Sequence, residues 1–397
     1  MVRAKSFCRS AGVLFLPSLV ALGCGGASGT HPDSLQADGS AMADSKAADG
    51  ARIPDAGAHE ASPTTTVDTG EAQDTDWLSG EAGTIVLPID GGNDAEKQPQ
   101  VATIVVLPDT QYYAASYPSV FTGQTEWIVA QKPALNIAAV LHVGDIVDGD
   151  IATQWTVANP AMRKLDNVVP YVVVPGNHDY SSADRKSGIE NYFAPSSMPW
   201  ITGTMTPGQI DNNFALIDIG PQKWLVLGLE FAPRDSVLAW ANTVLKTYAQ
   251  YPAILLTHLY LYNDGNRYDI NVSGTDTTKS NYQWWNPQWY GFTASEGMND
   301  GESMWQKLVL PNSNVRLVFC GHMTGWSRLT STRPDGTTVH QMLSDYQWLD
   351  GENFGFGYLR VLQLDYSNRK IQVQTFSPYR NAFLTDDPNQ FTLDLNL

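Results

Sequence analysis

The stretch Val172-Val173-Val174-Pro175-Gly176-Asn177-His178-Asp179-Tyr180 decides the fold of this chain. Its run of β-branched residues predicts a fully buried strand, and the Pro-Gly pair ends that strand. The loop that follows carries Asn177, His178 and Asp179, whose side chains can bind metals or move protons. In α/β sheets, ligands bind beyond the carboxyl ends of the strands. The stretch therefore predicts an α/β fold in which a strand delivers reactive side chains to one edge of a sheet.

Four other predicted strands end in the same kind of polar loop. The segments are 101–107 before Asp109 and Gln111, 138–143 before Asp145 and Asp148, 253–256 before His258, and 315–319 before His322 and Thr324. Chance does not readily place Asp, Asn or His after five strands of one chain. We therefore expect the five loops to meet at a single site.

The N-terminus, residues 1–23, has the pattern of a signal peptide. Basic residues precede a short apolar run at 11–22, and small residues follow it. The end of this segment, Leu19-Val20-Ala21-Leu22-Gly23-Cys24, resembles the lipobox of bacterial lipoproteins, in which the Cys is acylated. The resemblance implies that Cys24 is lipidated. The alternative is an ordinary cleaved signal followed by an incidental Cys.

Residues 24–98 are rich in Ala, Gly, Ser and Asp, with 14 acidic and 3 basic residues. Low hydrophobicity and like-charge repulsion leave such a segment unable to offset its ordering entropy. We expect a disordered acidic tether. Together with Cys24, it predicts an exported protein attached to the bacterial cell envelope, at the outer membrane or cell surface, through its lipid anchor alone.

Residues 99–397 are long enough for one large core and form the predicted folded domain. The chain has three Cys, and Cys320 is the one inside this domain, so no disulfide is expected there. The formal net charge of −17 argues against duplex nucleic acid, which is bound through Lys and Arg. We expect a monomer.

The folded domain alternates strands with helices and then becomes β-rich. Helical spacing predicts helices, and period-two patterns and turn signals predict strands. The predicted helices are 122–132, 151–167, 236–249 and 302–310. Among the later strands, 214–219 and 223–230 are predicted to pair with each other. The C-terminal strands are predicted at 326–332, 337–344, 355–364 and 370–376, and we expect them to complete a second sheet packed on the first.

Residues 263–301 form an insertion that is rich in aromatic residues and has no clear period. Two interpretations remain open. Its aromatic residues either wall a cleft and stack on an aromatic ligand, or supply a small core of the insertion itself. The residues concerned are Tyr282, Trp284, Trp285, Trp289, Tyr290 and Phe292.

In order along the chain, the polar loops read Asp-x-Gln, Gly-Asp-x-x-Asp, Gly-Asn-His-Asp, a lone His, and Gly-His-x-Thr. This pattern resembles the calcineurin-like metallophosphoesterase superfamily over nearly all of residues 101–377. The resemblance implies a four-layer β-sandwich of two mixed sheets flanked by helices. It also implies a metal-dependent phosphoesterase that hydrolyses phosphate mono- or diesters with a metal-activated water. The substrate that the resemblance implies is a phosphorylated small molecule or protein.

The resemblance also assigns roles to residues. It implies that Asp145 bridges one or two divalent metal ions, with Asn177, His258 and His322 completing one side and Asp109 opening the other. It gives His178 the role of proton donor to the leaving group, oriented by Asp148. Mixed nitrogen and oxygen ligands suit Mn, Fe, Zn or Mg, and the sequence does not choose among them.

Two positions depart from the commonest pattern of the superfamily. Gln111 and Thr324 stand where many relatives have His, and an amide or hydroxyl oxygen is a weaker ligand than imidazole. We expect the metal held by Asp109, Gln111 and Thr324 to be the weaker one, with His340 as a further candidate ligand. His142 is expected to pack or to support the ligands.

Because Gln111 and Thr324 are weaker ligands than His, a second hypothesis remains open. A non-catalytic metal-containing binding module of the same fold would not need strong ligands at Gln111 and Thr324. The pair of His178 and Asp148 argues against that alternative, because a purely structural metal site has no use for a proton donor.

Overall fold

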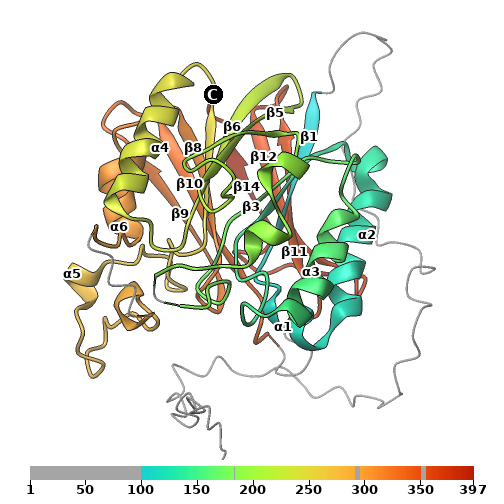
Figure 1. Cartoon of the computed structure of the whole chain (residues 1–397). Coiled ribbons are helices and arrows are strands. Elements are labelled where there is room, and N and C mark those ends of the chain that lie inside the picture. The colour runs from blue at the N-terminus through green and yellow to red at the C-terminus, as the bar shows by residue number, and fades with distance from the viewer. Residues whose placement is uncertain (1–99, 183, 291–295, 350–354) are drawn as a thin grey trace, which may run out of the picture. The chain divides into compact units, whose positions relative to one another are not determined.

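Two seven-stranded mixed sheets form the centre of the described chain (Figure 1). The computed structural model describes residues 100–182, 184–290, 296–349 and 355–397. The predicted signal peptide, Cys24 and the predicted tether lie outside the described residues, so those predictions stay open.

The first sheet has the order β13-β12-β11-β1-β2-β3, and β14 also pairs with β12. Its strands are β1 (Val101–Leu107), β2 (Ile137–His142), β3 (Tyr171–Val173), β11 (Leu359–Asp365), β12 (Lys370–Ser377), β13 (Ala382–Leu384) and β14 (Phe391–Asp394).

The second sheet has the order β4-β5-β6-β7-β8-β10-β9. Its strands are β4 (Ile201–Thr204), β5 (Asn213–Ile219), β6 (Gln222–Leu229), β7 (Ala253–Thr257), β8 (Val315–Cys320), β9 (Gly325–Thr332) and β10 (Thr338–Asp345).

Helices lie outside both sheets. The first sheet is covered by α1 (Gln111–Ser116), α2 (Pro118–Leu135) and α3 (Ala152–Arg163), and the second by α4 (Asp235–Thr247) and α6 (Gly301–Met304), which continues as a π-helical turn over Trp305–Val309 (Figure 1). The short α5 (Ile270–Ser273) lies in the aromatic insertion. Single 3₁₀ turns are at Ile189–Asn191, Pro195–Ser197 and Pro287–Tyr290.

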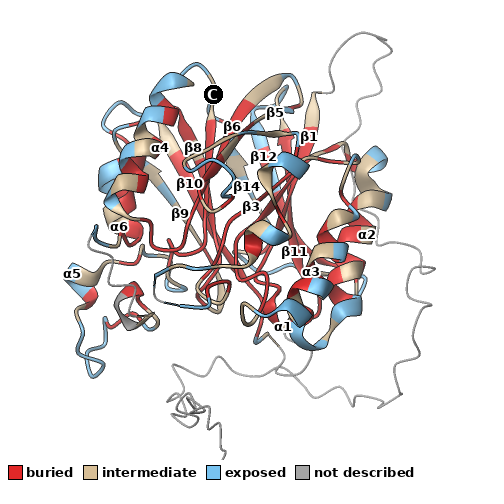
Figure 2. Ribbon diagram, in the orientation of Figure 1, coloured by how far each residue is buried: buried red, intermediate tan, exposed pale blue. Residues whose placement is uncertain are grey.

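Alternation of side chains along the strands builds three apolar layers. In β1, Ile104 and Val106 point between the sheets, while Val105 and Leu107 point toward the helices of the first sheet. The strands are buried and the outer faces of the helices are exposed (Figure 2). The four-layer arrangement confirms the predicted α/β sandwich of two mixed sheets flanked by helices.

The prediction that the last strands complete the second sheet is only half right. Strands β9 and β10 do join it, beside β8. Strands β11 and β12 return to the first sheet, where β11 pairs antiparallel with β1. Alternation of residues shows that a strand has a buried face, but it does not show which sheet the strand will join.

Some boundaries also differ from the predictions. Helix α2 begins four residues earlier than expected and continues past Pro133 to Leu135, where Asn136 ends it with φ at +48°. Helix α3 ends at Arg163, four residues before its predicted end, and the pattern missed the short strands β4, β13 and β14. Within the described residues, no helix is both long and apolar enough to cross a membrane.

Candidate metal centre

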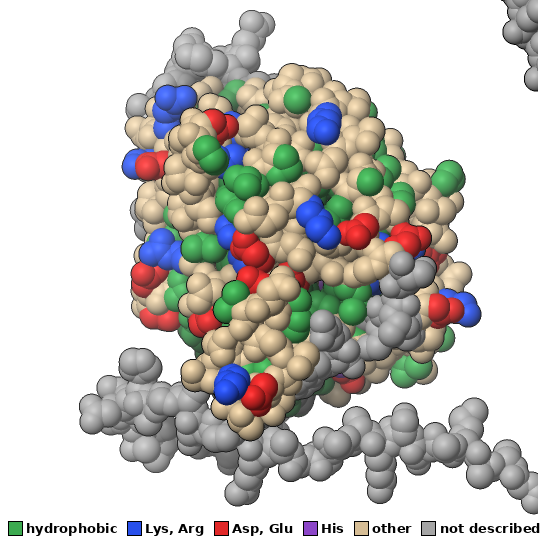
Figure 3. Space-filling view, turned by 90° about the vertical axis from the view of Figure 1, so that its left-hand side faces the viewer, with side chains coloured by type: hydrophobic (Ala, Val, Ile, Leu, Met, Phe, Trp, Pro, Cys, Tyr) green, Lys and Arg blue, Asp and Glu red, His purple; other side chains and the backbone are tan. Residues whose placement is uncertain are grey.

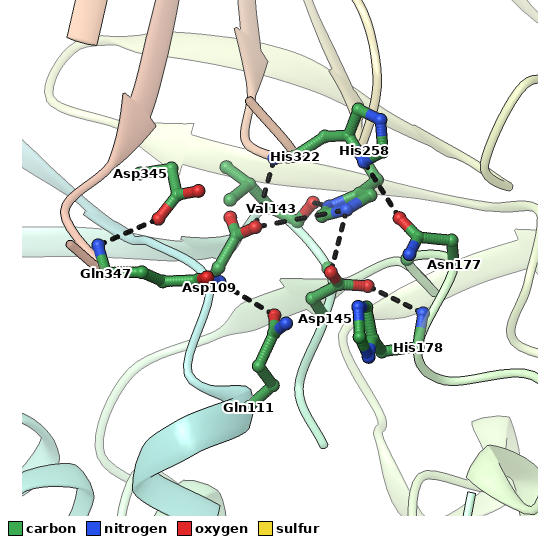
Figure 4. A network of polar contacts seen from close by, with 12 residues as sticks. Asp109, Gln111, Val143, Asp145, Asn177, His178, His258, His322, Asp345 and Gln347 are labelled. Carbon is green, nitrogen blue, oxygen red and sulfur yellow. Dashed lines mark hydrogen bonds and ion pairs between the residues drawn. The ribbon is translucent and has the colours of Figure 1, made fainter. Parts of the chain in front are cut away.

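The loops after five strands meet at one edge of the two sheets, as the sequence predicted. Strands β1, β2 and β3 are parallel neighbours in the first sheet, and β7 and β8 are parallel neighbours in the second. The first three deliver Asp109, Asp145 and Asn177, and the other two deliver His258 and His322 (Figure 4). The site is therefore built from both sheets.

Asp109, Asp145 and His258 form the buried centre of the cluster, with one ligand atom of each within 4.8 Å of the others. The His258 Nε2 atom lies 3.2 Å from Asp145 Oδ2 and 3.9 Å from Asp109 Oδ2. Because His258 Nδ1 lies 2.9 Å from the carbonyl oxygen of Val143 and can only donate to it, Nε2 is the ring nitrogen left for a metal ion. Three electron-pair donors thus converge, which is the arrangement that a cation stabilises.

His322 is a second histidine of the cluster, and both of its ring nitrogens lie close to oxygen atoms. Its Nε2 atom lies 2.7 Å from the carbonyl oxygen of Trp285, and its Nδ1 atom lies 2.8 Å from Asn177 Oδ1. Burial, and then the neighbouring His258, lowers the pKa of His322 to about 3, so the ring is neutral. A neutral ring carries one proton for these two contacts, so one ring nitrogen presents a lone pair to an oxygen; when the proton is on Nε2, Nδ1 and Asn177 Oδ1 are free to share a metal ion.

Backbone groups fix the two carboxylates. The His178 amide donates to Asp145 Oδ1 at 2.9 Å, and the His322 amide donates to Asp109 Oδ2 at 3.0 Å. A Cβ on Gly176 would lie 2.0 Å from Asp145 Oδ1, and a Cβ on Gly321 would lie 1.9 Å from Asp109 Oδ1. The glycines of the Gly-Asn-His-Asp and Gly-His motifs are therefore needed because only a residue without a Cβ lets the backbone of each loop lie this close to the carboxylate.

Asp179 joins two of these loops. Its carboxylate accepts hydrogen bonds from the backbone amides of Gly176, Ile146 and Val147, at 2.8 to 3.2 Å. The fourth residue of Gly-Asn-His-Asp thus holds the loop after β3 against the loop after β2.

The electrostatics of the cluster call for a positive charge. Burial, then the charges of Asp345 and Asp145, raise the pKa of Asp109 well above its usual value. Burial would also raise the pKa of Asp145, but His258 and His178 lower it well below its usual range. Asp109 Oδ1 and His258 Nε2 are buried without a hydrogen-bond partner among the described residues. These residues fit a divalent metal, since buried unpaired donor atoms are otherwise costly.

His178 and Asp148 lie together on the rim of the cluster. The His178 Nδ1 atom lies 2.9 Å from the Asp148 carbonyl oxygen and 3.4 Å from Asp148 Oδ1. Burial would lower the pKa of His178, but the charge of Asp145 and the contacts with Asp148 outweigh it and raise the pKa. Nδ1 is thus engaged by Asp148, which leaves Nε2 as the atom that can transfer a proton.

Gln111 and Thr324 both line the same cleft as Asp145, Asn177, His178 and His322. The Gln111 Oε1 atom accepts a hydrogen bond from Gln347 Nε2 at 2.8 Å. The Thr324 backbone carbonyl accepts from Asn263 at 3.2 Å. The predicted residues of the weaker side therefore lie at the site.

His142 and His340 have different surroundings. His142 is fully buried behind the cluster, 2.9 Å from the hydroxyl of Thr110, and burial lowers its pKa to about 3. The expectation of a packed, supporting His is met. His340 contacts Thr330 and the Asp394 carbonyl and lines a separate crevice, so it does not complete the metal centre.

Sequence reasoning missed Asp345 and Gln347, which both lie at the site. Asp345 is the last residue of β10 and is 1% exposed; burial raises its pKa to about 7, although the Gln347 amide donates to it. An Asp at the carboxyl end of a strand was the available signal, and it stood outside the five motifs.

A cleft of about 230 Å³ opens beside the cluster, and aromatic side chains form much of its wall: Tyr112, Trp285, Tyr290 and Trp348. Trp285 and Tyr290 come from the insertion and also pack against the core of the second sheet. Phe292 and the side chain of Trp289 lie outside the described residues. Trp285 and Tyr290 therefore wall a cleft, as the first interpretation expects, while stacking on a ligand stays a prediction; they pack against the core of the second sheet and not in a separate core of the insertion.

The sequence model of the calcineurin-like phosphoesterase family matches residues 102–324. Together with the two mixed sheets and the buried Asp-Asp-His cluster, this match shows that the chain belongs to that family of metal-dependent phosphoesterases.

An uncharacterized protein of Bacillus subtilis (strain 168), YvnB, is 36% identical to this chain over 315 residues. The aligned region is 74% of this chain and 22% of YvnB, so this chain spans about a fifth of that relative's length.

Two solved structures are also similar. GAP50, the anchor in the inner membrane complex of Plasmodium, gives a TM-score of 0.40 and 13% identity over 75% of this chain and 89% of its own. The sulfate thiohydrolase SoxB of Thermus thermophilus, in complex with glycerol, gives a TM-score of 0.32 and 11% identity over 70% of this chain and 42% of its own. Similarity at this level carries no functional argument.

Proposed function

We propose that this protein hydrolyses small phosphate mono- or diesters in a metal-dependent reaction, with His178 as the proton donor to the leaving group. The observation that carries the proposal is the convergence of ligand atoms from Asp109, Asp145 and His258, all within 4.8 Å of one another, beside an open cleft. His178 lines the same cleft, with Asp148 against its Nδ1 atom, where a leaving group would need a proton.

Asp145 is proposed to bridge two divalent ions. Asn177 Oδ1, His258 Nε2 and His322 Nδ1 would hold one of them, and Asp109 would hold the other with oxygen ligands that include Gln111. When bound, such ions neutralise phosphoryl oxygens and lower the pKa of water, so that hydroxide forms near neutral pH. The mixed nitrogen and oxygen donors of the first site suit Mn, Fe or Zn, and the oxygen donors of the second suit Mg or Mn.

The role of His178 follows from its contacts. Its Nδ1 is engaged by Asp148, and this contact favours a protonated ring whose Nε2–H is available to the leaving oxygen. A positioned acid of this kind contributes roughly 10²–10⁴-fold to a rate. The acid matters most where the leaving alkoxide is a strong base.

The cleft limits the substrate. None of its described lining residues is Lys or Arg, so the metal would supply the positive charge and a substrate with one phosphate is favoured over a polyphosphate. Its aromatic walls suit an aromatic or otherwise flat substituent on the ester. These features support a small phosphoester such as a nucleoside phosphate.

The cellular setting is part of the proposal. A lipidated Cys24 and an acidic tether would place the enzyme outside the cytoplasm, attached to the cell envelope. On the face drawn in Figure 3, Lys and Arg lie singly or beside acidic side chains and do not gather into a basic patch.

The alternative is a metal-containing binding module without catalysis, which the substitutions at Gln111 and Thr324 favour. One experiment separates the two functions. Protein freed of metal by chelation is supplied with Mn²⁺, and release of phosphate or alcohol is followed over a panel of aryl, alkyl and nucleoside phosphoesters. We expect turnover that requires metal and is abolished by Asp145→Asn. Two bound metals without turnover of any ester would favour the binding module.

A further inference from the structure

Asp345 is a buried carboxylate beside the metal centre that belongs to none of the five motifs. It is the last residue of β10, which runs parallel to β8, with Leu343 opposite Cys320. Because parallel strands end at the same edge, Asp345 emerges next to the Gly321-His322 loop. In Figure 4 its carboxylate lies beside that of Asp109, on the side of the cluster away from Asn177.

One oxygen of Asp345 has a partner and the other does not. The Gln347 backbone amide donates to Asp345 Oδ1 at 3.0 Å. Asp345 Oδ2 is buried without a hydrogen-bond partner among the described residues, as is the neighbouring Asp109 Oδ1. No described Lys or Arg forms an ion pair with either carboxylate. His258, 3.9 Å from Asp109 Oδ2, is the one ionisable ring paired with them among the described residues, and two adjacent buried acids are costly, so the pair requires a further cation or shares a proton.

Gln347 connects this carboxylate to Gln111. Its backbone amide holds Asp345, while its side-chain amide donates to Gln111 Oε1 at 2.8 Å. Gln347 thereby orients two oxygen donors on the side of the centre where relatives of the superfamily supply imidazoles. The oxygens of Asp345 and Gln111 thus belong to one hydrogen-bonded group, and the carboxylate of Asp109 lies beside that of Asp345 (Figure 4).

We propose that Asp345 is a ligand of the second metal ion and replaces the imidazole that Thr324 does not provide. The inference rests on the proposed two-metal function and extends it. The second site would then be an all-oxygen site with two carboxylates, a donor set that prefers hard cations such as Mg²⁺ or Mn²⁺. Its affinity would come from charge, and it would not be weak as the sequence alone suggests.

The test is metal binding by the full chain, measured without substrate. Wild-type protein, Asp345→Asn and the surface control Asp218→Asn are freed of metal and titrated with Mn²⁺, with free Mn²⁺ read by electron paramagnetic resonance. We expect two Mn²⁺ per chain for wild type and for the control. For Asp345→Asn we expect the first Mn²⁺ to bind as before and the second at least about 10-fold more weakly.

Thermal unfolding of the metal-free proteins provides the fold control. Asn keeps the shape of Asp345 and removes an unpaired buried charge, so the metal-free variant should unfold no earlier than wild type. Asp345→Ser is used if the Asn variant does not fold. Two Mn²⁺ bound by the variant with wild-type affinity, or one Mn²⁺ bound by wild type at saturation, would overturn the inference. Two bound ions without ester hydrolysis would instead contradict the proposed function and leave the assignment of Asp345 standing.

Discussion

The substitution Gly176→Ala tests how tightly the backbone holds the proposed bridging carboxylate. A Cβ at this position would lie 2.0 Å from Asp145 Oδ1 and 2.4 Å from the Asp145 amide nitrogen. To reach an ordinary contact of 3.4 Å, the carboxylate or the loop after β3 must retreat by about 1.4 Å. Overpacking of this kind costs roughly 1–3 kcal/mol of stability.

The effect on catalysis should exceed the effect on stability. Misplacing a reacting group by about 1 Å can cost on the order of 10²-fold in rate. We therefore expect Gly176→Ala to lower kcat/KM about 10²-fold with Mn²⁺ and nitrophenyl phosphate, and to lower the metal retained after gel filtration. Circular dichroism and the unfolding temperature show whether the variant is folded under the assay conditions.

Gly149 provides the matched control, because it lies in the neighbouring loop and a Cβ there meets nothing within 4 Å. Gly149→Ala should keep wild-type metal content and turnover. If Gly176→Ala behaves like Gly149→Ala in both measurements, Asp145 is not held against this loop as described, and its proposed bridging role fails with it.

Four further outcomes are expected. His178→Ala should slow alkyl phosphates about 10²–10⁴-fold and nitrophenyl phosphate far less, because nitrophenolate leaves without a proton; equal losses in steady-state kinetics would make His178 structural. His258→Ala should lose the first metal and leave no more than about one metal per chain by elemental analysis, and full activity in that variant would contradict the proposed site. Cys24→Ser should yield soluble, active protein, and persistent membrane attachment after a salt wash would locate the tether elsewhere. Burial, then Glu190 and Glu230, raise the pKa of Asp211 to about 8, so stability should fall as pH rises from about 4 to 8.

The Asp211 expectation has a specific control. A carboxyl group whose pKa is higher in the folded state binds its proton more tightly there, so raising the pH removes stability. Asp211→Asn cannot lose that proton and should flatten the pH dependence by a few kcal/mol at most, on the scale of about 1.4 kcal/mol per pKa unit. Chemical unfolding at pH 5 and pH 8 measures the difference, and parallel pH profiles for the two proteins would show that another group titrates.

The sequence predicted the site better than it predicted the sheets. Each motif couples a buried strand to a polar loop, so local pattern and chemistry point to the same residues, and Asp109, Asp145, Asn177, His178, His258 and His322 do lie together. No local sequence pattern of this kind shows which strand will pair with which in a sheet. The return of β11 to β1 is decided by packing between residues more than 250 positions apart, which periodicity does not encode.

Asp345 illustrates the same limit at the site. It is a single Asp at the end of a late strand, and many such residues are simply turn formers. Its importance depends on β10 lying parallel to β8, and on burial next to Asp109, which are tertiary facts. His340, five residues earlier on the same strand, is the more familiar metal ligand by type, yet its contacts with Thr330 and Asp394 direct it elsewhere.

The place of β1 in its sheet has a consequence for how the domain is assembled. On one side β1 pairs with β2, which follows within the next 41 residues, and on the other it pairs with β11, where Val101 lies opposite Asp365. Until the last strands are available, β1 presents an unpaired edge of buried apolar residues, a template for association with other chains. The residues that complete the hydrogen bonding of β1 therefore lie beyond residue 324, where the family match ends, and deletion of 355–397 should cost the whole domain its solubility.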